Sequence, residues 1–362
     1  MRVRRALLFL AIVAAQFAIF EAALRTWGHS EAAPAFQGLF VPDATIGYRL
    51  QPNARTRYST AEFETDIAIN AQGVRDDRDI GPKPRGEKRI VVLGDSLVLS
   101  VQVDVRQTFC RLLEERLNRD AGPIRYRVIN AGVQGYGPVE ELLFYRTVAR
   151  RFEPDLVIET IFVGNDAEEA VTSAPRLRAD TRPALQALPD SFRIRLRRIV
   201  RRSMVLQLIR LRIVSVTDRL GTWMSPPEPP LQSYAEKPAP RIDQGLRISR
   251  DCVQAIAADA AADGARTMVM LMPARFQVND VDYGHLRDAV DAAGGRLVRD
   301  AASERFDRAL STLPVPRFDA LPALRAALPG PDVFFQQTVH LTPRGHEIVA
   351  GALADFIRQQ GF

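Results

Sequence analysis

Apolar runs that alternate with helical patterns are the feature of this 362-residue sequence that most restricts its fold. The run RIVVL at 89–93 has the continuous apolar character of a buried parallel strand, and FCRLLEERLNR at 109–119 has the pattern of a helix. Two further strands, YRVIN at 126–130 and DLVIETIFV at 155–163, follow with a helical stretch between them. This alternation predicts βαβ units and a doubly wound parallel sheet.

The same rhythm resumes after residue 245. The expected elements are a helix at 246–262, a strand at 265–272, a helix near 282–296, a short strand around 314–318 and a last helix at 343–359. Thr342 is a suitable N-cap for the last helix, and Pro343 suits its first turn. The α/β domain is therefore predicted to span 86–362.

Two segments depart from this pattern. Residues 26–85 combine alternating apolar and polar residues with turn signals, which predicts a small β-rich lead-in that packs on the main domain. Residues 171–245 are expected to form a helical and Pro-rich insertion over the sheet. Within it, 192–214 contains eight arginines among aliphatic residues. A solvated amphipathic helix is the favoured interpretation, and contact with anionic headgroups or an acidic polymer is the alternative.

The N-terminus has the pattern of a membrane signal. Arg2, Arg4 and Arg5 precede the apolar run Ala6–Phe20. With the apolar residues that follow, the segment 1–25 is just long enough to cross a bilayer, and its arginines predict a cytoplasmic N-terminus. We expect an uncleaved single-pass anchor in a cell inner membrane, with a cleaved signal peptide as the alternative. Either one places the remaining chain in the periplasm or another extracytoplasmic space.

Composition excludes several classes of protein. Hydrophobic residues make up 46% and charged residues 25%, which argues against disordered, collagen-like and polytopic membrane proteins. The net charge of +6 is mild and dispersed, so nucleic acid is not an expected partner. Cys110 and Cys252 are the only cysteines, which excludes a disulfide-built scaffold. Two buried thiols are favoured over a single bridge.

Three short patches follow the predicted strands. In Gly94-Asp95-Ser96, the serine hydroxyl comes directly after a buried strand, where open α/β sheets place their ligands. The glycines of 130–137 allow a backbone N–H to point at an oxyanion, and the Asn165 side chain in Gly164-Asn165-Asp166 could donate to the same oxyanion. The alternative for the first patch is an Asp/Ser N-cap and for the third an Asx turn, and the glycine cluster taken alone favours a flexible strand–helix turn.

The fourth patch lies before the last helix. The chain has four histidines, at 29, 285, 340 and 346. His340 just precedes the predicted N-cap, from which an imidazole could reach Ser96 and accept its proton. A structural histidine is the alternative, and we expect that role for His346, one turn inside the helix.

Together and in this order, the four patches resemble the SGNH or GDSL hydrolase family. Ser96 matches the nucleophile, Gly135 the glycine of the second block, Asn165 the asparagine of the third block and His340 the catalytic histidine. The lead-in resembles that of membrane-anchored bacterial members. One position departs from the pattern: the family usually carries Asp three residues before the histidine, where this chain has Gln337.

The resemblance implies a flavodoxin-like three-layer α/β/α fold and ester hydrolysis without cofactor or metal. The Ser96 N–H, the Gly135 N–H and the Asn165 side chain would form the oxyanion hole, and Ser96 would form an acyl-enzyme with His340 as base. A glutamine at 337 could orient the imidazole but could not stabilise its charged form. Other supports are a backbone carbonyl or a carboxylate from elsewhere, of which Asp332 is the nearest in sequence.

The leading hypothesis is therefore an exported esterase that acts on O-acyl groups of a surface glycan or on an acylated lipid. An O-acyltransferase would use the same residues, with a sugar hydroxyl in place of water. A non-catalytic glycan-binding or assembly protein is the alternative that Gln337 favours.

Overall fold

The structure is a computed structural model that describes residue 16 and residues 38–119, 122–177, 231–330 and 332–362. The chain divides into two compact units, and nearly all described residues belong to the unit formed by 34–178 and 230–362. Within the described ranges, no helix has both the length and the apolar character needed to cross a bilayer. The predicted anchor at 1–25, apart from residue 16, and the arginine-rich segment 192–214 lie outside these ranges.

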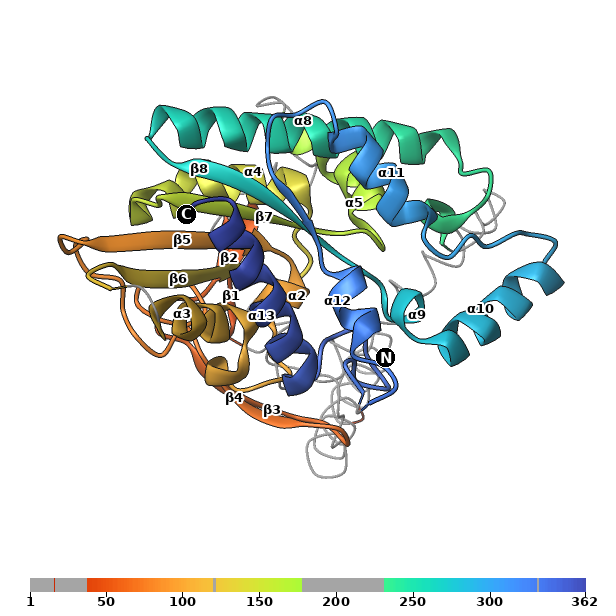
Figure 1. Cartoon of the computed structure of the whole chain (residues 1–362), viewed down its shortest axis with the longest axis horizontal. Helices are drawn as coiled ribbons and strands as arrows, with labels where there is room; N and C mark the ends of the chain where they lie inside the picture. The colour runs from red at the N-terminus through yellow and green to blue at the C-terminus, as the bar shows by residue number, and fades with distance from the viewer. Residues whose placement is uncertain (1–15, 17–37, 120–121, 178–230, 331) are drawn as a thin grey trace, which may run out of the picture. The chain divides into compact units, whose positions relative to one another are not determined.

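The unit is built on a five-stranded parallel sheet (Figure 1). Its strands are β5 (Glu87–Gly94), β6 (Arg125–Gly132), β7 (Leu156–Phe162), β8 (Arg266–Met272) and β9 (Arg317–Asp319). Their spatial order is β6-β5-β7-β8-β9, which in chain order is the 2-1-3-4-5 arrangement of flavodoxin-like folds. The parallel α/β sheet predicted from the apolar runs is thus confirmed, and the order reverses at β5, beside the predicted nucleophile.

Helices cover both faces of the sheet, because strands buried on both sides need two apolar partners. α3 (Phe109–Arg119) packs against α13 (Pro343–Gln359) on one face, and α8 (Pro240–Ala262) packs against α4 (Pro138–Thr147) and α5 (Asp166–Ser173) on the other (Figure 1). The remaining α-helices of the described ranges are α2 (Ser96–Leu99), α9 (Arg275–Val278), α10 (Asp280–Ala292), α11 (Ala301–Leu310) and α12 (Leu321–Ala326). The short 3-10 helices are η1 (Val105–Gln107), η2 (Ala149–Phe152), η3 (Ala174–Leu177) and η5 (Gln232–Tyr234).

The lead-in forms two antiparallel hairpins. β1 (Phe40–Asp43) pairs with β2 (Gly47–Leu50), and β3 (Arg55–Ser59) pairs with β4 (Glu64–Ala68). The apolar residues of both hairpins share one core cluster with β5, β6 and α4. As expected, the lead-in therefore packs on the sheet domain.

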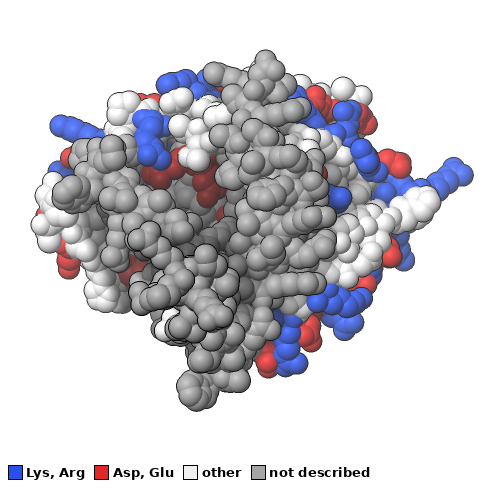
Figure 2. Space-filling model, turned by 180° about the vertical axis from the view of Figure 1, so that it is seen from behind, with Lys and Arg blue, Asp and Glu red and all other residues white. Residues whose placement is uncertain are grey.

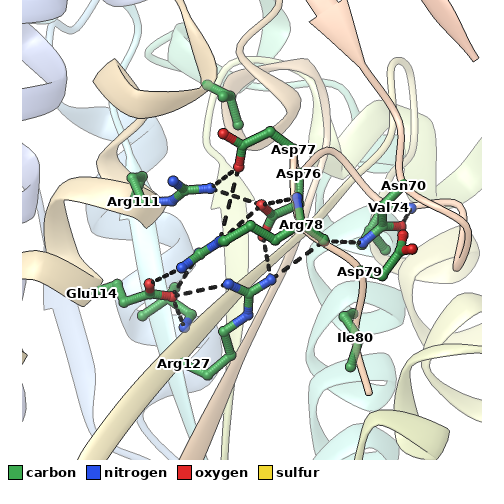
Figure 3. Close-up of polar contacts among 12 residues, drawn as sticks. Asn70, Val74, Asp76, Asp77, Arg78, Asp79, Ile80, Arg111, Glu114 and Arg127 are labelled. Carbon is green, nitrogen blue, oxygen red and sulfur yellow. Dashed lines mark hydrogen bonds and ion pairs between the residues drawn. The ribbon is translucent and has the colours of Figure 1, made fainter. Parts of the chain in front are cut away.

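An ion-pair network fastens the lead-in to the edge of the sheet (Figure 3). Asp76 accepts hydrogen bonds from Arg111 of α3 at 2.7 Å and from Arg127 of β6 at 2.8 Å. Arg78 forms a two-point contact with Glu114 of α3, at 2.7 and 3.1 Å. The side chains of Asp76, Glu114, Arg111 and Arg127 are at most 12% exposed, and the network links the lead-in to α3 and to β6.

Some predicted boundaries differ from the structure. The residues 171–177 continue α5 into η3, and 231–245 contain η5 and the first turns of α8, so both ends of the predicted insertion belong to the sheet unit. α8 begins at Pro240 rather than 246, because a proline in the first turn needs no backbone donor. α10 covers 280–292 rather than 282–296, and β9 begins at Arg317 rather than 314. Cys110 and Cys252 are buried free thiols.

Candidate active site

Three of the predicted site segments leave neighbouring strands at one edge of the sheet. Gly94, at the end of β5, is in register with Gly132, at the end of β6, and β5 also pairs with β7. Ser96 follows β5, Gly135 follows β6 and Asn165 follows β7. The topology therefore brings these three residues to the carboxyl edge, beside the reversal of strand order where such sheets bind ligands.

Ser96 is the first residue of the short helix α2. The carboxylate of Asp95 caps this helix by accepting the Leu97 N–H at 2.8 Å. Gly94 permits the tight entry to the helix, since a Cβ at this position would lie 2.2 Å from the Val98 side chain. The pKa of Asp95 is raised to about 6 by burial, and hydrogen bonds from nearby backbone groups partly oppose this rise. The strand end thus presents a serine that is only 8% exposed.

Gly135 lies in an exposed turn that the lead-in supports. Its φ of +70° is left-handed, a conformation that favours glycine. The Tyr48 hydroxyl of β2 donates to the carbonyl of Gln134 at 2.7 Å and lies 3.3 Å from that of Gly135. The Gly135 N–H has no acceptor among the described residues. It is therefore an available donor at the carboxyl edge.

Asn165, the N-cap residue of α5, has its amide fixed by a neighbouring carboxylate. The Nδ2 group donates to Glu169 Oε1 at 2.7 Å, and the buried Oδ1 has no partner within the described structure. Because an ionised carboxylate only accepts, this contact sets which end of the amide carries the N–H groups when Glu169 is ionised. One N–H engages Glu169, and the second remains for a ligand.

The last helix places His340 at the same edge of the sheet. Arg266, at the start of β8, donates to the Gln360 carbonyl at 2.9 Å, so α13 ends at the amino edge. Its first turn lies beside the start of α3, where the Phe109 N–H donates to His346 Nδ1 at 3.2 Å and the two rings stack. His340 precedes this first turn and thus belongs to the carboxyl edge. His346 has the structural contact that the sequence favoured.

The His340 imidazole makes no hydrogen bond to the described residues. Both ring nitrogens are buried without a partner, and burial lowers the pKa of His340 to about 4. No hydrogen bond joins Ser96 to His340 in this part of the chain. The expected orienters are also elsewhere: the Gln337 side chain is exposed, and Asp332 accepts from Gln336 Nε2 at 3.0 Å. The structure thus places His340 at the same edge of the sheet as Ser96, and no hydrogen-bonded triad forms among the described residues.

Buried carboxyl groups surround the strand ends. Asp95, Glu141, Glu159 and Asp166 are each at most 6% exposed, and burial raises the pKa of every one. No three or more metal-ligating side chains of the described ranges are arranged to hold an ion. On the face seen in Figure 2, basic and acidic side chains both appear around the periphery.

Two residues of the site were missed from the sequence. Glu169 lies one helical turn after Asn165, so the four-residue spacing could have identified it as a partner of the amide. Tyr48 had no such signal, because it lies 86 residues from Gln134. Contacts of this kind depend on how the lead-in packs.

Comparison with known families supports the resemblance for one part of the chain. Residues 232–362 match the family model described as "SGNH hydrolase-like domain, acetyltransferase AlgX". The match contains His340 and does not extend to Ser96, Gly135 or Asn165. No curated protein matches this chain.

Solved structures give weaker similarities. TesA is 13% identical, with 75% of this chain and 99% of TesA covered at a TM-score of 0.41. A two-domain esterase active on acetylated mannans is 13% identical, with coverage of 76% and 50% and a TM-score of 0.41. A catalytic mutant of the acetylxylan esterase Axe2 from Geobacillus stearothermophilus is 11% identical, with coverage of 75% and 94% and a TM-score of 0.41.

Proposed function

We propose that the protein is a serine-dependent acyl-transferring enzyme with Ser96 as nucleophile, and the match of residues 232–362 to the model of an SGNH hydrolase-like domain supports this proposal. The observation that carries the proposal is the topology of the sheet. It places Ser96, Gly135, Asn165 and the loop of His340 at one carboxyl edge, although these residues are dispersed over more than half of the chain.

The proposed reaction has two steps. Ser96 Oγ attacks the carbonyl carbon of an acyl ester, and His340 accepts the hydroxyl proton. The oxyanion forms against the N–H groups of Ser96 and Gly135 and the free amide N–H of Asn165. As the ester C–O bond breaks, His340 returns the proton to the leaving alcohol. Water, or the hydroxyl of an acceptor, then attacks the acyl-enzyme and restores Ser96.

The variant Ser96→Ala tests the nucleophile. We expect it to lower kcat for a short acyl ester by about 10³-fold or more, because the covalent route is lost. The matched control is Ser311→Ala, an exposed serine next to α11. Turnover that is equal in Ser96→Ala and wild type would refute the assignment.

Transfer to an acceptor is the second candidate activity, because the matching family model carries the description of an acetyltransferase. The plausible substrates are O-acyl groups of a surface glycan or lipid. Hydrolysis and transfer separate in one experiment: a glycan acceptor is added to the acyl donor, and acylated glycan is measured beside free acid. Product formed only as free acid favours the esterase.

A non-catalytic binding or assembly role is the remaining alternative. Two features favour it: Gln337 stands where the family usually has Asp, and the His340 imidazole makes no hydrogen bond to the described residues. A fluorophosphonate probe that labels wild type but not Ser96→Ala would argue against it. We propose an extracytoplasmic location for the reaction, on the basis of the anchor predicted at 1–25; protease protection of the full chain in membranes tests this orientation.

A further inference from the structure

The loop that carries His340 is held by a carboxylate from the lead-in. Glu62 lies in the turn between β3 and β4, about 270 residues away in sequence. Its Oε1 accepts the Gln336 N–H at 2.7 Å, and its Oε2 accepts the Gln337 N–H at 2.9 Å. One carboxylate thus binds two consecutive backbone donors, which fixes the direction of the chain at that point.

A guanidinium binds the carbonyls of the same short segment. Arg275 of α9 donates to the carbonyl oxygen of Phe335 at 3.0 Å and to that of Gln336. Asp282 of α10 holds the other edge of this guanidinium at 2.8 Å. The Glu62 carboxylate therefore binds N–H groups of the segment 335–337, and the Arg275 guanidinium binds carbonyl groups of the same segment.

Aromatic rings reinforce the contact between the lead-in and this loop. The rings of Phe63 and Phe335 have centroids 5.2 Å apart, and Tyr58 packs edge-on against Phe63 at 5.0 Å. Phe63 directly follows Glu62, so the polar and the apolar contacts act on the same two segments. The loop conformation consequently depends on the β3–β4 hairpin.

The segment 335–337 also carries the position that departs from the family pattern. Gln337 stands three residues before His340, and its exposed side chain makes no hydrogen bond to the imidazole within the described residues. The backbone at this position is instead bound by Glu62. The Gln337 side chain therefore does not support the imidazole, whereas the Gln337 main chain is held by Glu62.

We propose that Glu62 is a positioning residue for His340: by binding the N–H groups of Gln336 and Gln337, it holds the histidine loop at the carboxyl edge of the sheet. This inference rests on the proposed function for its kinetic consequence, but the loop geometry does not depend on that function. Displacement of a catalytic group by 1 Å can cost about 10²-fold in rate.

The lead-in contacts the other site segments in the same way. Tyr48 supports the turn of Gly135, as described above. Arg75 is completely buried and donates to the carbonyl of Leu99, the last residue of the helix that begins with Ser96, at 2.7 Å, and to that of Val103, in the loop that follows, at 2.5 Å. Three lead-in side chains thus support three separate site segments, which makes a role in positioning the site a consistent property of this region.

The test compares three variants of the full chain. Glu62→Ala removes both acceptors, Glu62→Gln retains one acceptor oxygen, and Glu64→Gln removes an exposed carboxylate of the same hairpin that pairs with Arg57. For a short acyl ester, we expect Glu62→Ala to lower kcat by about 10²-fold with little change in KM. Glu62→Gln should recover part of the loss, and Glu64→Gln should match wild type.

A second readout follows the imidazole itself. The titration of His340, assigned by NMR through its loss in His340→Gln, should move toward the ordinary histidine pKa in Glu62→Ala, because a released loop exposes the ring to water. An unchanged His340 titration together with unchanged kcat would overturn the proposal. If wild type shows no Ser96-dependent turnover, the proposed function fails, and the NMR titration still decides the role of Glu62.

Discussion

At the scale of single residues, a carboxyl group contacts Asn165, the proposed oxyanion donor. Glu169 fixes the amide of Asn165, and its pKa is raised to about 7 by burial and by the neighbouring charges of Asp95 and Glu140. Below this pH the carboxyl group is neutral. Above it, a negative charge lies beside the donor that is expected to stabilise an oxyanion, which opposes the reaction.

We therefore expect the kcat/KM of wild type to fall as the pH rises through about 7, the pKa of Glu169. Glu169→Gln should remove this decline, because the amide cannot ionise but still offers an oxygen to Asn165. The pH profile between 5 and 9 is the measurement, with Glu168→Gln of the same helix as control. A decline that persists unaltered in Glu169→Gln contradicts the assignment.

We expect His340 to determine the acid side of the same profile. A general base must be neutral, and burial lowers the pKa of His340 to about 4. Activity should then persist well below pH 6.5 and be lost only as pH approaches 4. The measurement is kcat/KM at decreasing pH, with circular dichroism as a check that the chain stays folded. Loss of activity centred between pH 6 and 7 would show that the imidazole is hydrated during the reaction.

At the scale of elements, α4 and β7 face each other through two carboxyl groups. Glu141 and Glu159 are 1% and 0% exposed, and their oxygens have no hydrogen-bond partner in the described structure. Burial and mutual repulsion raise the pKa of Glu141, and burial raises that of Glu159 to about 7. Ionisation of either group would place a buried charge between α4 and β7.

The sign of the pH dependence follows from these shifts. A group whose pKa is higher in the folded state than in the unfolded state stabilises the folded protein at pH values below its unfolded pKa. For Glu159, this stabilisation is lost as the pH rises through about 7. Glu159→Gln should therefore increase the free energy of unfolding by about 2 kcal/mol at pH 8 and change it little at pH 4.5. Urea denaturation at both pH values measures this difference. Glu115→Gln, exposed on α3, is the control, and an equal effect of Glu159→Gln at both pH values contradicts the prediction.

At the scale of the whole unit, the network around Asp76 couples the lead-in to the sheet (Figure 3). Asp76 receives hydrogen bonds from Arg111 and Arg127, whose side chains are only 12% exposed. Removal of one partner from such a group leaves buried charge uncompensated. The lead-in and the sheet domain should therefore lose stability together.

Asp76→Ala should lower the free energy of unfolding by about 3 kcal/mol, while unfolding remains a single transition. The matched control is Asp66→Ala, an exposed aspartate in β4, for which we expect less than about 0.5 kcal/mol. Urea denaturation followed by fluorescence and by circular dichroism tests both points. Two separated transitions in wild type would show that the lead-in is not coupled to the sheet.

Local sequence patterns were sufficient to predict those helices and strands whose physical cause is itself local. The helix at 109–119 matches α3, and the helix at 343–359 matches α13 together with its Thr342 cap. The strand runs predicted β5 to β8 to within a few residues. Helices α9 and α12, of four and six residues, were not predicted, because such short segments have no distinct periodicity.

The sequence by itself determined the parallel α/β sheet and the order in which Ser96, Gly135, Asn165 and His340 follow its elements, because apolar periodicity and turn residues act over a few positions. Only the tertiary structure decided that Glu62 binds the main chain at Gln337, and that no orienting group contacts the His340 imidazole within the described residues. The contacts of Glu62 with the histidine loop join segments about 270 residues apart in sequence. They arise from packing of the lead-in on the domain, which no local sequence pattern encodes.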